Sequence, residues 1–153
     1  MTPEQRLQQL GLILPPVVTP RGSFEAWVLD GSMLYLSGKG SPLRQDLSQV
    51  PKVGREISAD EARAHAHEVG LNLIATMKSA LGELSRVRRV VKLLGMVNAT
   101  PDFTGHTEVI NGCSDLMVQV FGDAGRHARS AVGVSSLPRG FAVEIEAIVS
   151  ITE

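Results

Sequence analysis

The sequence predicts an α+β fold, a two-layer sandwich in which two helices cover one face of a single mixed sheet. Two observations favour this class: strand-like segments alternate with two long segments of helical hydrophobic spacing, and the last strand-like segment has an apolar residue at every second position. Two helices of similar apolar width need the same sheet face, and right-handed crossovers place both of them there. With 153 residues the chain is long enough to bury a core without disulfide or metal support.

The first 22 residues are expected to form an N-terminal extension to a single domain at residues 23–153. Residues 4–10 have a short helical pattern, and prolines at positions 15, 16 and 20 indicate an extended stretch behind it. We assign no chemistry to this extension.

A β-hairpin is predicted at residues 24–37. Two runs rich in strand-favouring side chains flank the dipeptide Asp30-Gly31, which favours a tight turn. Residues 38–57 then mix glycine, proline and charge without a sustained period, so we expect a surface loop there.

Two helices are predicted, the first from Ser58 to Gly82 and the second over about residues 102–121. Ser58 and Glu61 have the spacing of a capping box at the start of a helix. Apolar residues then recur every three or four positions, namely Ala62, Ala66, Val69, Leu73, Met77 and Leu81. The second helix has an equivalent stripe of Val109, Ile110, Cys113, Leu116, Met117, Val120 and Phe121.

The remaining strands are expected at residues 87–97, 130–135 and 141–152, with the last two joined as a hairpin. The first is β-branched and apolar, which suits a largely covered strand. In the last strand the odd-numbered residues are apolar, and the opposite face mixes Glu144 and Glu146 with Ile148. That second face is too apolar for plain solvent surface, so the sequence predicts self-association as a closed symmetric oligomer.

The charge balance gives no reason to expect nucleic acid as a partner. Fifteen basic and 16 acidic side chains leave a formal net charge of −1. The start of the chain does not have the pattern of a signal peptide, and no uncharged apolar run approaches the roughly 20 residues of a membrane-spanning helix. We therefore expect a cytoplasmic protein without membrane contact.

Most residues with reactive side chains do not form a recognisable site. The four histidines lack metal-ligand spacing, since His65 and His67 point to different sides of a helix, and we predict no metal site. Cys113 lies on the apolar stripe of the second helix and is expected in the core. The basic residues between 86 and 92 fall on both faces of a strand and suit a solvated edge.

Arg129 and Glu144 are different, because local structure gives neither a stabilising role. Arg129 comes directly before a predicted strand, and Glu144 interrupts an apolar one. An arginine there can hold a carboxylate through two hydrogen bonds, and a partly desolvated glutamate can position or deprotonate water. The alternative is a salt bridge of Arg129 with Glu144 or Glu146 at a subunit interface. Spacing alone leaves the two interpretations equal.

These residues lie in segments that resemble the YjgF/RidA family of reactive intermediate deaminases, also labelled endoribonuclease L-PSP. The similarity extends from about Phe24 to the end of the chain. Its most specific parts are residues 34–38, Asn111, residues 128–130, Leu137-Pro138 and residues 143–148. Residues 125–134 are similar to a long-chain subgroup of this family.

The resemblance implies a chorismate-mutase-like (bacillar) fold and a homotrimer whose sheets form an inner barrel, with three clefts between neighbouring subunits. The active members of the family hydrolyse enamines and imines, such as 2-aminoacrylate and 2-iminopropanoate, to 2-oxoacids and ammonia. They need no metal or organic cofactor. The resemblance therefore implies a small-molecule carboxylate as the ligand.

The resemblance also assigns roles to single residues. Arg129 matches the arginine that binds the substrate carboxylate, and Glu144 matches the glutamate that orients or activates the attacking water. Ser37 and Gly38 match the segment that lines the cleft, and Asn111 matches a cleft-side helix residue. The family's cleft tyrosine falls on Phe24, which keeps the ring and lacks the hydroxyl. This departure keeps a second function open, a non-catalytic trimer that binds small carboxylate metabolites at the same clefts.

Overall fold

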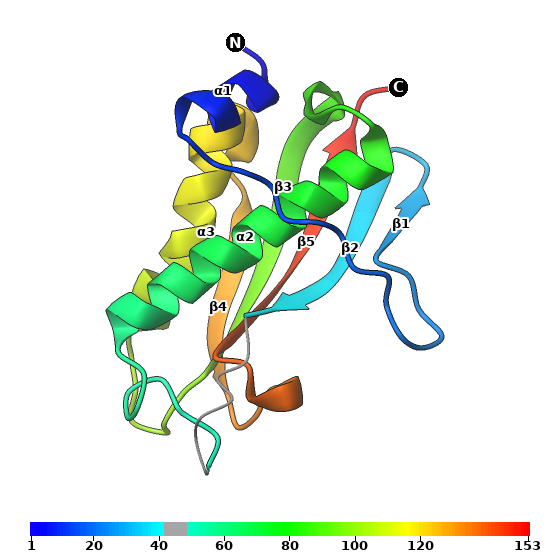
Figure 1. Cartoon of the computed structure of the whole chain (residues 1–153). Helices are drawn as coiled ribbons and strands as arrows, with labels where there is room; N and C mark the ends of the chain where they lie inside the picture. Colours follow the sequence, from blue (N-terminus) through cyan, green and yellow to red (C-terminus); the bar gives the residue numbers. More distant parts are fainter. Residues whose placement is uncertain (42–48) are drawn as a thin grey trace.

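Five strands form a single mixed sheet in the order β1-β2-β5-β3-β4, and helices α2 and α3 cover one of its faces (Figure 1). The computed structural model describes residues 1–41 and 49–153. In chain order the elements are α1 (Pro3–Gln9), β1 (Trp27–Asp30), β2 (Met33–Gly40), α2 (Ala59–Leu81), β3 (Val87–Asn98), α3 (His106–Phe121), β4 (Ala128–Val134) and β5 (Val143–Ile151). The predicted α+β class, with two helices on one face of a mixed sheet, is confirmed.

Local sequence signals account for the hairpin and for both ends of α2. Asp30 pairs with Met33 across the turn of the hairpin, and Gly31 has a φ of 61°, which glycine adopts without steric cost. At the start of α2 the Ser58 hydroxyl accepts a hydrogen bond of 3.1 Å from the Glu61 N–H. Gly82 ends this helix, with a φ of 83°.

The last two strands do not pair with each other, so the hairpin expected between them is wrong. β4 pairs with β3 in parallel, whereas β5 lies between β2 and β3 and is antiparallel to both. Burial explains this order. The side chains of Val143, Ile145 and Val149 in β5 are fully buried. A strand with so many apolar side chains gains most from burial at the centre of the sheet. β4 is largely exposed and suits the edge.

Three strand boundaries also differ from expectation. β1 begins at Trp27 rather than at residue 24, β2 continues to Gly40 rather than ending before a loop at residue 38, and β4 begins at Ala128 rather than at residue 130. In each case pairing with the neighbouring strand of the sheet decides the boundary. The end of β2, for example, pairs with β5 after a bulge. Residues 42–48 of the predicted loop lie outside the described residues.

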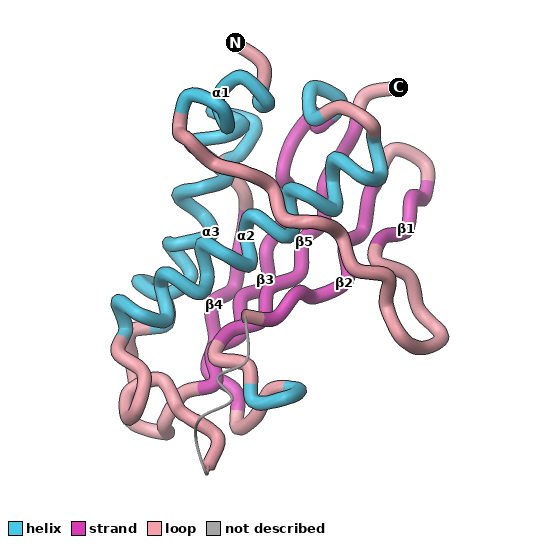
Figure 2. The backbone as a smooth tube through the Cα atoms, viewed as in Figure 1, coloured by secondary structure: helices cyan, strands magenta, loops and turns pink. Residues whose placement is uncertain are grey.

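The segment between α1 and β1 runs as a long loop over α2 (Figure 2). α1 contacts α3, and its Leu7 joins the core. The Glu4 carboxylate accepts hydrogen bonds from the Leu84 N–H at 2.7 Å and from Lys78 Nζ at 3.1 Å. These contacts fix the start of the loop, and its later part, residues 17–24, reaches the end of β2.

The core lies between the sheet and the two long helices. The predicted apolar stripes of α2 and α3 are buried there. Cys113 is fully buried as expected, and burial raises the pKa of its thiol to about 12. Across residues 1–41 and 49–153, no helix combines the length and the apolar character needed to cross a membrane.

The contact between α2 and α3 gives the first prediction, for Gly112→Ala. A Cβ at Gly112 would lie 2.1 Å from the backbone carbonyl oxygen of Arg63, whereas a Cβ at Gly70 would meet the side-chain ends of Leu116 and Cys113 at 2.9 and 3.2 Å. Alanine raises helix propensity at both positions by about 1 kcal/mol. We expect Gly112→Ala to lower the free energy of unfolding by about 2–3 kcal/mol, because the helix backbones must separate. Gly70→Ala is the matched control, with a much smaller loss in urea denaturation; equal losses would contradict this prediction.

Candidate functional site

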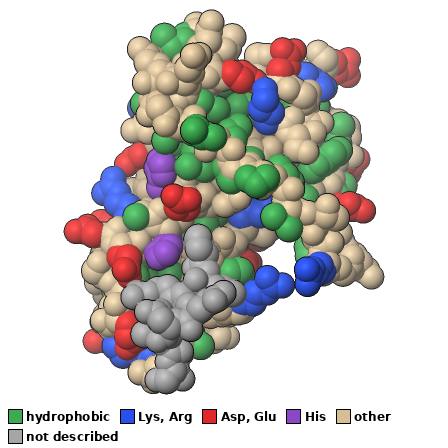
Figure 3. Space-filling model, in the orientation of Figure 1, with side chains coloured by type: hydrophobic (Ala, Val, Ile, Leu, Met, Phe, Trp, Pro, Cys, Tyr) green, Lys and Arg blue, Asp and Glu red, His purple; other side chains and the backbone are tan. Residues whose placement is uncertain are grey.

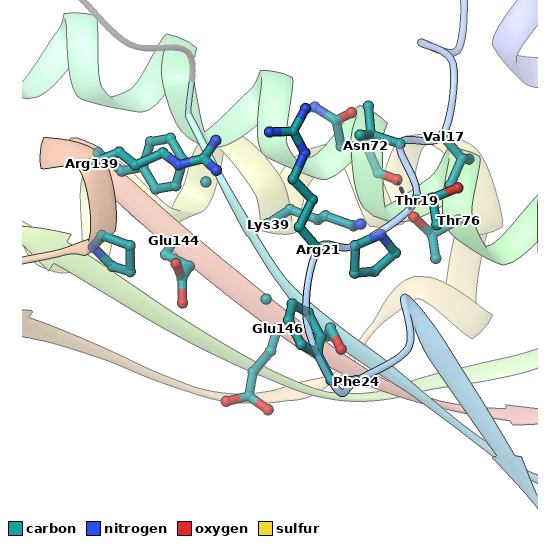
Figure 4. Close-up of a pocket in the computed structure, with 17 residues that line it drawn as sticks. Val17, Thr19, Arg21, Phe24, Lys39, Asn72, Thr76, Arg139, Glu144 and Glu146 are labelled. Atoms are coloured by element: carbon teal, nitrogen blue, oxygen red, sulfur yellow. Dashed lines mark hydrogen bonds between the residues drawn. The ribbon is translucent and has the colours of Figure 1, made fainter.

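A cleft of about 810 Å³ lies along the outer edge of β2, beyond the point where β1 stops (Figure 4). It is lined by the loop segment 17–24, the end of β2 at residues 37–40, the α2 side chains Asn72 and Thr76, the turn η3 (Pro138–Gly140) and part of β5. It contains four residues that the sequence assigned to the site: Phe24, Ser37, Gly38 and Glu144. The structure therefore brings these four together.

The cleft exists because β1 is short. Its last pair with β2 is Trp27 with Leu36, so the backbone after Leu36 has no strand neighbour on that side. Ser37 anchors the chain at this point, since its hydroxyl donates a 2.6 Å hydrogen bond to the Glu25 carbonyl and its N–H donates one of 3.0 Å to the Ala26 carbonyl. The open edge of β2 then forms one wall of the cleft.

Gly38 allows the Glu144 carboxylate to lie directly against β2. A Cβ at Gly38 would stand 2.9 Å from Glu144 Oε2, so a larger residue would displace the carboxylate. Glu144 is half-buried and, among the described residues, has no hydrogen-bond or ion-pair partner. Burial raises the pKa of this carboxyl, and the neighbouring Glu146 carboxylate raises it further. An unpartnered carboxylate with a raised pKa is a better proton acceptor than an ordinary glutamate.

Phe24 lies at the same cleft with its side chain accessible. It is 57% exposed, and its ring packs beside Gly22. Its place beside Ser37 and Glu144 agrees with a ring that covers a bound ligand, without a hydroxyl to bond it.

Arg129 lies elsewhere in the chain, on the other face of the sheet. It pairs with Leu93, whose buried side chain faces the helices, and its guanidinium reaches α3. Nη1 donates to Ser114 Oγ at 3.0 Å and Nη2 to the Thr107 carbonyl at 3.3 Å. Asn111 stands on the same side of α3 as these two residues, four positions after Thr107.

His127 supports the position of Arg129 through Ser114. The Gly125 carbonyl can only accept a hydrogen bond, so His127 donates to it from Nδ1 at 2.6 Å. Neutral His127 then accepts the Ser114 hydroxyl proton at Nε2, at 2.8 Å, and the lone pairs of Ser114 Oγ remain available to Arg129. Burial lowers the pKa of His127, the Gly125 hydrogen bond opposes this, and the Arg129 charge lowers the pKa further. The neutral form that this arrangement needs is therefore favoured.

One chain does not bring Arg129 and Asn111 to the cleft that holds Glu144. Side chains alternate along strands, and Glu144 lies between the fully buried, helix-facing Val143 and Ile145. Glu144 therefore faces the side of the sheet opposite to Arg129. A salt bridge from Arg129 to Glu144 or to Glu146 does not form within the chain. The site residues form two separate groups, one around Glu144 and one around Arg129.

Five further residues belong to these groups and were not predicted. Ser114 and His127 hold Arg129, and the signal for His127 was its position two residues before Arg129. Three cations line the cleft of Glu144, namely Arg21, Lys39 and Arg139. In the part of the chain that the structure describes, no three His, Cys, Asp or Glu side chains gather in a way that could hold a metal ion.

Comparison with known proteins identifies the family. A family profile described as "YjgF/chorismate_mutase-like, putative endoribonuclease" matches residues 4–142. The protein TCP17 of Trypanosoma cruzi is 41% identical over 146 residues, which cover 95% of this chain and 91% of that protein. The chain therefore belongs to the YjgF/RidA family, as its sequence indicated.

Solved structures agree with this assignment. The protein Atu1372 of Agrobacterium tumefaciens, described as of unknown function, superposes with a TM-score of 0.85 at 40% identity, over 99% of this chain and 94% of that one. RidA of an Antarctic Psychrobacter superposes with a TM-score of 0.59 at 26% identity, over 88% of this chain and 94% of that one. The fold is thus the chorismate-mutase-like fold of the family.

Proposed function

We propose that this protein hydrolyses 2-imino acids and their enamine tautomers to 2-oxoacids and ammonia, without a cofactor. The observation that carries the proposal is the half-buried, unpartnered Glu144 carboxylate in a cleft that also holds Phe24, Ser37 and Gly38. The similarity to the Psychrobacter protein named RidA supports the proposal, because the sequence resembles the RidA family of deaminases.

The complete site combines the two groups across a subunit interface. We propose a homotrimer in which the Arg129 group of one subunit faces the Glu144 cleft of the next. The uncovered sheet face supports association, because it exposes Val28, Tyr35 and Val132 and has a shallow hollow bordered by Leu94 and Ile148. Arg129, already held by Ser114, then presents its remaining guanidinium protons to the substrate carboxylate.

Hydrolysis then requires one proton acceptor. A water oxygen bonds to the carbon of the protonated imine, the electrons of the carbon–nitrogen π bond pass to nitrogen, and a water proton passes to Glu144, which gives a neutral carbinolamine. Glu144 returns this proton to the nitrogen, the carbon–nitrogen bond breaks as ammonia leaves, and the carbinolamine hydroxyl gives its proton to the ammonia as its oxygen becomes the carbonyl of the 2-oxoacid. Glu144 serves first as base and then as acid, for which a pKa above the usual carboxyl range is suited.

The direct test is the decay of enzymatically generated 2-iminopropanoate with the wild type and with Arg129→Ala. Wild type is expected to accelerate the decay, and the variant to have a kcat/KM roughly 10- to 100-fold lower, because a charge-assisted pair to the substrate carboxylate is lost. Arg126→Ala is the matched control, since Arg126 is exposed and, among residues 1–41 and 49–153, forms an ion pair only with Asp123, at 3.8 Å. No acceleration by wild type would refute the proposed activity, and full activity of Arg129→Ala would refute the role of Arg129.

Phe24 supports a second candidate, a trimer that binds small carboxylates at the same clefts without turnover. For the hydrolase, Phe24→Tyr is expected to raise kcat/KM by roughly 2- to 12-fold, the value of one hydrogen bond to a bound polar group. For the binding protein, titration calorimetry is expected to show saturable binding of 2-oxoacids while wild type leaves the imine decay unchanged. The two results separate the candidates.

A further inference from the structure

The cleft of Glu144 contains a cluster of cations that the proposed reaction does not use. Arg21 comes from the loop over α2, Lys39 from β2 and Arg139 from η3. None of the three forms an ion pair or a side-chain hydrogen bond with another described residue. Lys and Arg side chains also gather around a notch in the molecular outline in Figure 3. Three separate segments therefore bring positive charge to one hollow.

The directions of these side chains separate the cleft into two ends. In Figure 4 the guanidinium groups of Arg21 and Arg139 point toward each other across the cleft, and the Lys39 amine extends toward Thr76 of α2. Glu144 lies away from the Lys39 amine in this view, and Glu146 points out of the cleft. A ligand that presents its reacting carbon to Glu144 therefore extends toward the cations.

Lys39 and Arg139 are both held at a cost that an anionic ligand would offset. Burial lowers the pKa of Lys39, as expected for a partly desolvated amine without a counter-ion. Arg139 has a φ of 55°, a left-handed conformation that a residue with a Cβ rarely adopts. Such strain at a cleft points to a functional side chain, since glycine or asparagine would fit the backbone better.

The size of the cleft also exceeds what a three-carbon acid needs. About 810 Å³ lies near the upper end of the range of roughly 300–1,000 Å³ found for sites of drug-sized ligands. A three-carbon acid beside Glu144 therefore leaves room in the cleft for a longer side chain.

We propose that the substrate is a 2-imino acid whose side chain has a second anionic group, a carboxylate or a phosphate, which Lys39, Arg21 and Arg139 bind. This inference rests on the proposed function and names its substrate class. The neighbour's Arg129 takes the carboxylate next to the imine, Glu144 faces the imine carbon, and the three cations take the far end of the side chain.

The test uses binding, so that it does not depend on turnover. Titration calorimetry with 2-oxoglutarate and with 2-oxopentanoate compares two acids of the same chain length that differ in the second carboxylate. Wild type is expected to bind the dianion at least about tenfold more tightly. Lys39→Met and Arg139→Gly are each expected to remove most of this preference, whereas Arg88→Met, at an exposed position of β3 outside the cleft, leaves it unchanged.

A phosphonate analogue of 2-oxoglutarate distinguishes the two anions, since tighter binding of the phosphonate identifies the second group as a phosphate. Equal affinity of wild type for 2-oxoglutarate and 2-oxopentanoate would overturn the inference, as would an unchanged preference in Lys39→Met. If wild type hydrolyses 2-iminopropanoate but binds 2-oxoglutarate no more tightly than 2-oxopentanoate, only the present inference fails. If the preference holds without any hydrolysis, the anion site stands and the proposed reaction fails.

Discussion

Glu144→Gln is expected to lower kcat/KM for imine hydrolysis roughly 100- to 10,000-fold, the range typical of a lost general base. The amide has the same shape as the carboxylate, so it fits the space that Gly38 leaves beside β2. It cannot accept a proton from water, and no other carboxylate of the cleft faces the same point, because Glu146 points outward in Figure 4. Steady-state kinetics on 2-iminopropanoate measure the effect, and an active Glu144→Gln would exclude the proposed base.

The stability of this variant distinguishes lost chemistry from lost folding. The pKa of Glu144 is raised in the folded protein, so its ionisation at neutral pH disfavours the folded state relative to the unfolded one. Replacing the carboxylate by a neutral amide removes that penalty. We therefore expect the Tm of Glu144→Gln at pH 7 to equal or exceed that of wild type. A clear drop in Tm would show that the carboxylate stabilises the fold.

The same pKa shift sets the pH dependence of activity. Activity requires ionised Glu144, so it falls as the pH falls through the raised pKa, and this occurs at a higher pH than for an ordinary glutamate. Glu146 is the second cause of the raised pKa, after burial. Glu146→Gln is therefore expected to move the acidic limb of the kcat/KM profile to lower pH while keeping the maximum rate. An unmoved limb would mean that another group titrates there.

Local sequence signals were sufficient to predict the turns and helix ends that depend on residues close together in the chain. Asp30-Gly31 fixes the turn of the hairpin, and Ser58 and Gly82 fix the ends of α2. The position of β5 was not predictable in this way. Alternation along a strand shows which side chains share a face, whereas the choice of neighbouring strands depends on contacts between distant segments. β5 therefore looked like the partner of β4, although it lies between β2 and β3.

The candidate site shows the same division. Ser37, Gly38 and Glu144 were predicted and lie together, because β2 and β5 are direct neighbours. Arg21 and Arg139 were not predicted. Each lies in an irregular segment, where no hydrophobic periodicity indicates the direction of a side chain. Only the course of the loop over α2 brings Arg21 to the cleft. Lys39 was assigned to a surface loop because residues 38–57 mix glycine, proline and charge without a sustained period, yet the pairing of β2 with β5 holds it in a strand.

Mixing two impaired variants is expected to restore activity above that of either variant alone if the site is shared between subunits. Arg129 faces the helices and Glu144 the opposite side of the sheet, so one chain cannot bring both to one substrate. A subunit with Arg129→Ala still offers an intact Glu144 cleft, and one with Glu144→Gln still offers an intact Arg129. Each trimer that contains both variants then has one complete cleft. It lies at the interface where the intact Arg129 of one subunit faces the intact Glu144 of the next.

Random assembly from equal amounts of the two variants makes about three quarters of the trimers mixed. Each mixed trimer has one complete site out of three, so roughly a quarter of the wild-type activity is expected. Co-refolding the two variants and measuring 2-iminopropanoate decay checks this. Arg129→Ala refolded with the double variant Arg129→Ala/Glu144→Gln is the matched control; it contains no intact Arg129 and is expected to show no activity beyond the residual activity of Arg129→Ala. If Glu144 and Arg129 instead acted within one chain, mixing would restore nothing, because every chain present lacks one of the two. Recovery near a quarter thus tests the shared cleft, and because each interface is complete with the same probability in any closed ring, the trimer itself is checked by the mass of the assembly in solution.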